Sequence, residues 1–104
     1  MGRKKTPQII FFKNIMTNQQ IIEKIYKLQL LLKGKNGPVA SALERATIPL
    51  IEHEHPLYTA SRKELIGING IGEATATLIM RIINGEHVYD IAATVPKPNP
   101  NFAP

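Results

Sequence analysis

Aliphatic residues recur every three or four positions through most of this 104-residue chain, and glycine or proline marks each break. The two clearest runs are Ile21, Ile25, Leu28 and Leu32, and then Ala76, Ile79, Ile82 and Ile83. This spacing places the apolar side chains on one face of an α-helix, whereas a half-buried strand alternates every second residue. The sequence therefore predicts an all-α fold, a small four-helix bundle in one domain.

Capping signals set the boundaries of the first two expected helices. Thr17 and Gln20 have the spacing of a capping box, which predicts a helix over 18–33. Pro38 suits the first turn of a second helix, because its missing N–H would have no partner there. Pro49 is expected to bend or end that second helix, because it removes a backbone donor.

The second half of the chain predicts two further helices joined by a tight turn. Ser61 and Glu64 form another capping box and open a short third helix. A glycine-rich stretch over 67–72 follows, and then a fourth helix that ends at Asn84-Gly85. Residues 86–93 are expected to add one further helical turn.

Both ends of the chain have the composition of tails. Residues 1–16 are a basic and apolar arm, 17–93 the folded domain, and 94–104 a proline-rich tail that we expect to be disordered. Within the arm, Ile9–Phe12 is apolar enough to fold back onto the domain. The chain is thus expected to be one folded unit between two flexible tails.

The turn at Gly70-Ile71-Gly72 has the chemistry of a phosphate-binding site. Its glycines allow positive φ and close approach of the backbone to a ligand, while Ile71 plugs into the core. Backbone N–H groups at the start of the next helix have no intrahelical partner and lie at the positive end of its dipole. Phosphate oxygens suit such donors, and phosphates are the same at every step of a nucleic acid. Contact of this kind is independent of base sequence.

The residues around this turn resemble the helix-hairpin-helix motif. The positions that fit its hydrophobic, glycine and small-residue pattern are Leu65, Ile68, Gly70, Ile71, Gly72, Ala76 and Ile79. Roughly residues 18–91 are similar to the amino-terminal domain of family X DNA polymerases and to the related domain of XPF-type structure-selective nucleases. That wider similarity rests on the order of Arg45-Ala46, Pro56-Leu57, Ser61 and Glu64-Leu65.

The resemblance implies a DNA-binding module without sequence specificity, in DNA repair or replication. It implies that DNA backbone, in the minor groove or at gaps and ends, meets the turn through Gly70, Ile71, Gly72 and the amides of Glu73 and Ala74. Some members of the family hold a monovalent cation on the turn carbonyls, which here are those of Ile68 and Ile71. No other cofactor and no metal site is expected.

Two positions depart from the family pattern. Many DNA-binding members have a proline or basic residues after the second glycine, where this chain has Glu73 and Ala74. An exposed carboxylate there weakens phosphate binding by about 1 kcal/mol through like-charge repulsion. In the polymerase branch a lysine six residues after the second glycine forms a Schiff base, and Leu78 stands at that position. We therefore expect a binding protein and no deoxyribose-phosphate lyase activity.

Charge is distributed unevenly along the chain. Residues 1–35 carry a formal charge of +7 and the remainder −2, which gives +5 in total. Such asymmetry is typical of a basic region that meets nucleic acid, and a solvated charged face is the alternative. One group of candidate DNA contacts is expected along the first helix: Lys24, Lys27, Lys33 and Lys35. A second group is expected beside the glycine turn: Arg62, Lys63 and Arg81.

Other interpretations stay open. The same fold serves relatives as a protein–protein interaction or dimerisation module, and a lysine outside the family position, such as Lys63, is a remaining candidate for lyase chemistry. His53-Glu54-His55 is expected to be an exposed loop and not a metal site. Tyr26 is expected in the core and not as a base-stacking platform.

Composition also bears on location. The chain has no cysteine, so it has neither a disulfide framework nor a thiolate site. No run approaches the ~18 apolar residues that cross a bilayer, so no membrane partner is expected. We expect an intracellular protein, nuclear in a eukaryote and otherwise cytoplasmic or nucleoid-associated.

Overall fold

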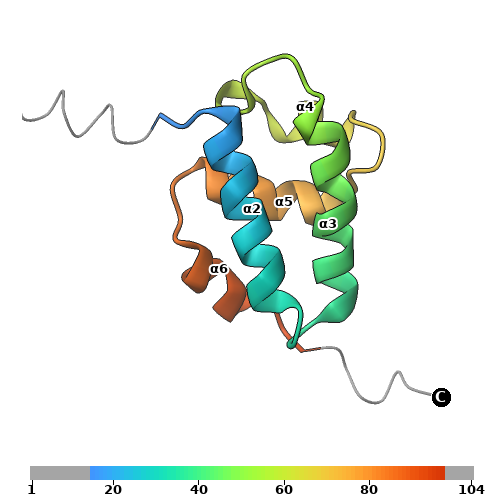
Figure 1. Cartoon of the computed structure of the whole chain (residues 1–104), viewed down its shortest axis with the longest axis vertical. Coiled ribbons are helices and arrows are strands. Elements are labelled where there is room, and N and C mark those ends of the chain that lie inside the picture. The colour runs from blue at the N-terminus through green and yellow to red at the C-terminus, as the bar shows by residue number, and fades with distance from the viewer. Residues whose placement is uncertain (1–14, 98–104) are drawn as a thin grey trace, which may run out of the picture.

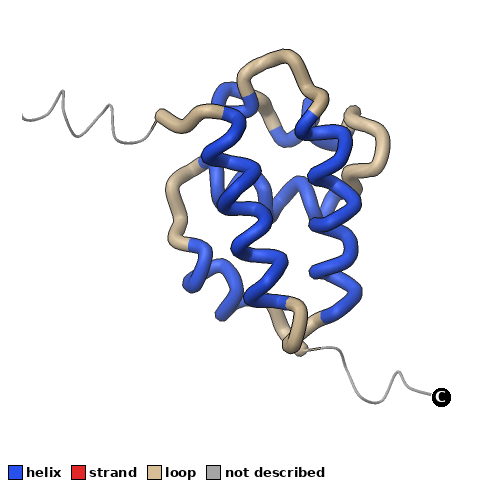
Figure 2. The backbone as a smooth tube through the Cα atoms, in the orientation of Figure 1, coloured by secondary structure: helices blue, strands red, loops and turns tan. Residues whose placement is uncertain are grey.

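The structure is a computed structural model that describes residues 15–97 (Figures 1 and 2). Within that range the chain forms helices and no strand: α2 (Asn18–Leu32), α3 (Gly37–Ile51), the 3-10 helix η2 (Leu57–Thr59), α4 (Arg62–Ile66), α5 (Glu73–Ile83) and α6 (Val88–Thr94). The prediction of an all-α fold is confirmed. The described residues hold five α-helices where four were expected, because the segment before Thr94 forms a helix of its own.

Most of the predicted arm and tail, residues 1–14 and 98–104, lies outside the described residues, and Ile9–Phe12 lies there too. The folded part extends past the expected boundary at residue 93. Helix α6 runs to Thr94, Val95 is buried, and the Asn36 side-chain amide donates to the Pro96 carbonyl at 2.9 Å. One buried apolar side chain and one hydrogen bond thus hold residues 95–96 on the folded part.

The helices pack in two layers. Helices α2 and α3 lie side by side and antiparallel, α5 passes behind both of them, and α6 lies beside α2 (Figure 1). Fully buried side chains from α2, α3 and α5 form the centre of the core: Ile21, Ile25, Leu43, Leu50, Ile79 and Ile82. Each such side chain contributes about 1.5–3 kcal/mol of transfer free energy on burial. The direction of α5 matters for function, because its two ends emerge on opposite sides of the α2–α3 pair (Figure 1).

Local sequence signals explain the helix ends. Both predicted capping boxes are present: the Thr17 hydroxyl accepts from the Gln20 N–H, the Ser61 hydroxyl from the Glu64 N–H, and both reciprocal bonds form. Pro49 lies in the last turn of α3, which ends two residues later at Ile51. These predicted boundaries are confirmed, because caps and prolines act within one turn of the chain.

The prediction for Tyr26 is wrong. Its side chain is 55% exposed, although its neighbour Ile25 is fully buried. Successive residues on a helix differ by about 100° in direction, so Tyr26 lies off the buried stripe of α2. None of the helices between residues 15 and 97 is both long and apolar enough to span a membrane.

Candidate functional site

Residues 67–72, the glycine turn, connect α4 to α5 and lie at the edge of the molecule beside α3 (Figure 1). Gly70 has φ +100°, a left-handed conformation that favours glycine, whereas Gly72 has φ −89°. A Cβ on Gly70 would lie 3.9 Å from Cγ of Pro49, so the turn packs against the end of α3. Only one of the two glycines is therefore required by backbone conformation.

Ile71 anchors the turn. Its side chain is buried, as predicted, and its N–H donates to the Ile68 carbonyl at 3.1 Å. The turn is therefore fixed from within by one side chain and one backbone bond. As a result the Ile71 amide is not available to a ligand, and this candidate contact is removed from the predicted set. The cation prediction for the carbonyls of Ile68 and Ile71 stays a prediction.

The backbone donors that follow the turn lie at the surface. Gly72 is the N-cap of α5, and no side chain of the described residues caps this end. The first bond inside the helix runs from the Ala76 N–H to the Gly72 carbonyl at 2.9 Å. The N–H groups of Glu73 and Ala74 precede it and so have no intrahelical acceptor, and both residues are exposed. The start of α5 thus presents backbone donors and a positive dipole end to solvent.

Arg62 spans the glycine turn. Its Nε donates to the Thr77 hydroxyl at 3.1 Å, and its Nη2 donates to the Glu73 carbonyl at 3.4 Å. The same Nη2 lies 3.8 Å from the Glu73 carboxylate, in an exposed ion pair. The guanidinium therefore lies next to the start of α5 and partly neutralises the Glu73 carboxylate. Lys63 is exposed on the same short helix.

Arg81 does not lie beside the glycine turn. It is eight residues from Glu73 along α5, about 12 Å at 1.5 Å per residue. Its Nε and Nη2 donate to the Glu86 carboxylate at 3.0 and 2.7 Å, and its Nη1 donates to the Thr94 hydroxyl at 2.6 Å. The hydrogen bond from Arg81 lowers the pKa of Glu86 and raises the pKa of Arg81. Arg81 thus joins the end of α5 to α6, at the negative end of the α5 dipole.

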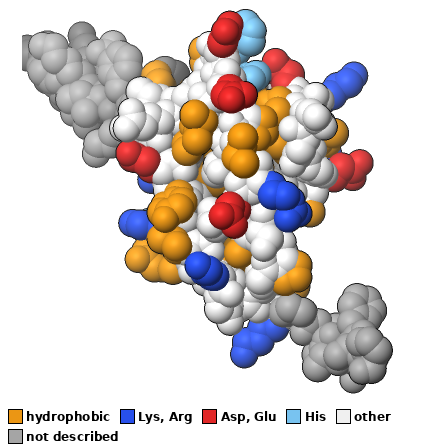
Figure 3. Space-filling view, turned by 45° about the vertical axis from the view of Figure 1, so that its right-hand side comes forward, with side chains coloured by type: hydrophobic (Ala, Val, Ile, Leu, Met, Phe, Trp, Pro, Cys, Tyr) orange, Lys and Arg blue, Asp and Glu red, His pale blue; other side chains and the backbone are white. Residues whose placement is uncertain are grey.

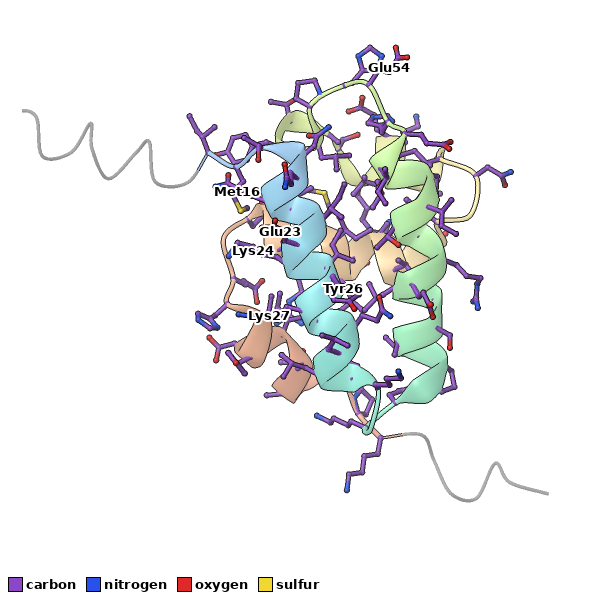
Figure 4. All side chains as sticks on the ribbon, viewed as in Figure 1. Met16, Glu23, Lys24, Tyr26, Lys27 and Glu54 are labelled. Carbon is purple, nitrogen blue, oxygen red and sulfur yellow. The ribbon has the colours of Figure 1, made fainter. Side chains whose placement is uncertain are left out.

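The four lysines predicted as DNA contacts along the first helix do not lie on one continuous surface. Lys24 and Lys27 lie on the side of α2 that faces away from α3 (Figure 4). Lys33 is exposed at the end of α2, while the Lys35 ammonium donates to the Ala92 carbonyl at 2.8 Å. Lys35 therefore binds the end of α6. The glycine turn lies across the molecule from Lys24 and Lys27 (Figures 1 and 4).

Lys24 and Lys27 border a hollow that the sequence analysis did not find. This α2–α6 groove has a volume of about 630 Å³ and lies between α2 and the connection from α5 to α6. Its lining includes Met16, Glu23, Lys24, Lys27, Gly85, Glu86 and His87. Gly85, with φ +92°, makes the reversal that brings His87 and Val88 toward α2. The Asn84-Gly85 pair predicted the end of the helix from sequence. No local signal predicted that α2 would lie beside the residues that follow it.

The loop after α3 is exposed as expected, apart from a partly buried His53. Asn18 holds it against α2, since its side chain donates to the His55 carbonyl at 2.9 Å and accepts from the Leu57 N–H at 2.7 Å. Leu78 is partly buried against the core. Basic and acidic side chains are interspersed with apolar ones on the face that Figure 3 shows. Side-chain charge therefore does not single out that face for a polyanion.

No family model, curated protein or solved structure matches this chain. Two surfaces, one at each end of α5, are the candidate functional sites. The glycine turn presents backbone donors, while the α2–α6 groove presents lysine and apolar side chains.

Proposed function

We propose that this protein binds the phosphate backbone of duplex DNA, without base specificity, through a helix-hairpin-helix formed by α4, the glycine turn and α5. The observation that carries the proposal is the exposed start of α5, where the N–H groups of Glu73 and Ala74 have no intrahelical acceptor. Phosphate oxygens accept from such groups, and the dipole of the 11-residue helix favours the anion.

Side chains beside the turn support the same binding mode. The Arg62 guanidinium lies against the first residue of α5 and adds a cation to the backbone donors. Lys63 is exposed on the adjacent turn of α4. Two cations and a set of amides position a phosphodiester strand without reading base edges. The resemblance noted in the sequence places such a module in DNA repair or replication.

We propose no catalytic role for this protein. Leu78 stands where the lyase branch of the family has its lysine, and its side chain is partly buried and cannot form a Schiff base. The protein acts as a binding module that holds duplex backbone for another activity.

Fluorescence anisotropy with a short labelled duplex tests this function. At low salt we expect saturable binding that weakens steeply as salt rises, because neutralised phosphates release counterions. The double variant R62E/K63E should lower affinity by at least about tenfold, since it replaces two cations beside the amides with two anions. Arg81 is left unchanged, because it lies away from the glycine turn and joins α5 to α6 through Glu86 and Thr94.

The matched control is K24E/K27E, which makes the same change of charge at the other end of α5. It should lower duplex affinity by less than about threefold, through the long-range field alone. Equal losses in both variants would mean that general charge, not the glycine turn, binds DNA. No binding at low salt would reject the DNA-binding proposal and favour the protein-interaction module.

A further inference from the structure

The α2–α6 groove has an apolar lining at its α2 entrance. Ile15 is 49% exposed there, Met16 is partly buried, and the buried side chains of Ile82 and Val88 lie beneath them. Its volume of about 630 Å³ is within the range of ligand-binding clefts. Methionine adapts its shape to different apolar partners. The groove can therefore take up apolar side chains from a ligand.

The charge that the groove presents is basic. Lys24 and Lys27 lie one helical turn apart, and neither takes part in an ion pair within residues 15–97. Two carboxylates also line the groove: Glu86, which is bound by Arg81, and Glu23, which accepts from the Gln19 amide at 3.5 Å. The α5 carbonyls of Ile82 and Arg81 accept from the N–H groups of Gly85 and Glu86. With Glu86 bound by Arg81, two ammonium groups and the Glu23 carboxylate remain, so the groove keeps a net positive charge.

We propose that the α2–α6 groove docks an acidic, amphipathic peptide segment of a partner protein. Apolar side chains of the peptide pack on Ile15 and Met16, and its carboxylates pair with Lys24 and Lys27. A short amphipathic helix presents both kinds of side chain on adjacent stripes. The groove lies at the other end of α5 from the glycine turn, so peptide and DNA can be bound together.

Charge complementarity selects this occupant over two others. The chain's own arm contains Arg3, Lys4, Lys5 and Lys13 and no acidic residue, so Lys24 and Lys27 repel it. A nucleic-acid strand satisfies the lysines but leaves the apolar floor uncovered, because its phosphates need charge and donors only. A peptide with carboxylates and apolar side chains satisfies both parts of the groove.

The test is a ¹H–¹⁵N NMR titration of the full chain with a designed peptide of about 15 residues, with leucines and glutamates on adjacent stripes of one helix. The control peptide has lysine in place of every glutamate. We expect the acidic peptide alone to bind, with shifts gathered at the amides of Lys24, Lys27 and His87. The variant K24E/K27E should weaken this binding at least about tenfold, and K33E/K97E, with equal charge change outside the groove, less than about twofold.

Several results would overturn the proposal. Equal binding of the two peptides, shifts elsewhere, or no shift at millimolar acidic peptide would each exclude an acidic ligand for this groove. A single-stranded or duplex oligonucleotide that shifts the same amides more strongly would identify the groove as a nucleic-acid surface. If F11S/F12S shifts the groove amides in the protein alone, the arm occupies the groove. None of these outcomes depends on whether the glycine turn binds DNA.

Discussion

The two ends of α5 present different chemistry to solvent. At its start, Gly72, Glu73 and Ala74 are exposed, and Arg62 from α4 bonds to the Glu73 carbonyl. At its end, the backbone groups bond to one another, and lysines of α2 border an apolar hollow. An 11-residue helix is about 16 Å long, so the two surfaces are separate. The two ends of one short helix thus differ in kind, because the start leaves N–H groups without an intrahelical acceptor whereas carbonyls near the end are bonded.

Arg62 and Arg81 contact opposite ends of α5 and have different roles. Arg62 bonds to the first turn of α5 and adds positive charge where the dipole is already positive. Arg81 lies in the last turn, where a cation is stabilised by the dipole, and its guanidinium is bound by Glu86 and Thr94. Arg81 therefore stabilises the fold, whereas the positive charge of Arg62 lies where it would attract an anion that approaches the start of α5.

The largest expected effect comes from the core that both surfaces share. Ile79 is fully buried in the middle of α5, and I79A should lower the free energy of unfolding by about 2–5 kcal/mol. Chemical denaturation measures this loss. Ile48 is 64% exposed, so I48A should change stability by less than about 0.5 kcal/mol. Similar values for the two variants would mean that α5 is not packed as described.

Two glycines allow the surfaces to be disturbed one at a time. Gly70 and Gly85 both have positive φ, one at each end of α5, so G70A and G85A should each cost about 1–2 kcal/mol of stability. Only G70A should weaken duplex binding, and only G85A should weaken binding of the acidic peptide. Gly34 has no positive φ and open space at its Cβ, so G34A is a near-neutral control. Loss of both ligands in either variant would show that the two ends are not independent.

Replacing Glu73 tests whether its carboxylate limits phosphate binding at the start of α5. E73Q should raise duplex affinity about threefold to tenfold at low salt, because it removes repulsion of phosphate and releases Arg62 from its ion pair. The exposed Glu44 on α3 gives the control E44Q, for which we expect a smaller gain. Anisotropy titrations with the same duplex compare the two. Equal gains would show a net-charge effect and no special role for Glu73.

The smallest expected effect is a pH dependence at the other end of α5. Arg81 holds the pKa of Glu86 below its ordinary value near 4.5, so the pair stabilises the fold above that pH. This contribution is lost as the pH falls and Glu86 becomes protonated in the folded protein. Urea unfolding between about pH 5 and pH 3 should therefore show a steeper loss for the natural chain than for E86Q. Parallel curves would contradict the assignment.

The sequence predicted those parts of the fold that depend on neighbours along the chain. Both capping boxes, the position of Pro49 in α3 and the burial of Ile71 follow from local pattern. The exposed start of α5 follows in the same way, since any helix leaves its first N–H groups without an intrahelical partner. Sequence rules are sufficient where the hydrogen-bond or packing partner of a residue lies within one or two helical turns along the chain.

Features that depend on how α5 crosses the other helices could not be predicted. Arg81 is near the glycine turn in sequence, but the length of the helix carries it to the far side. Lys24 and Lys27 were expected to contact DNA together with the other lysines of the first helix. In the structure they lie on the side of α2 near α6 (Figure 4). Tyr26 fits the helical period only at the edge of the apolar stripe, where tertiary packing decides exposure. The groove requires α2, α5 and α6 together.

The most direct test of the account is a ¹H–¹⁵N NMR titration of the full chain with a short duplex at low salt. We predict the largest shift changes at the amides of Gly72, Glu73 and Ala74, with little change at Lys24, Lys27 and His87. Shifts confined to the second group, or spread evenly over all exposed lysines and arginines, would contradict the claim that the start of α5 binds the phosphate backbone.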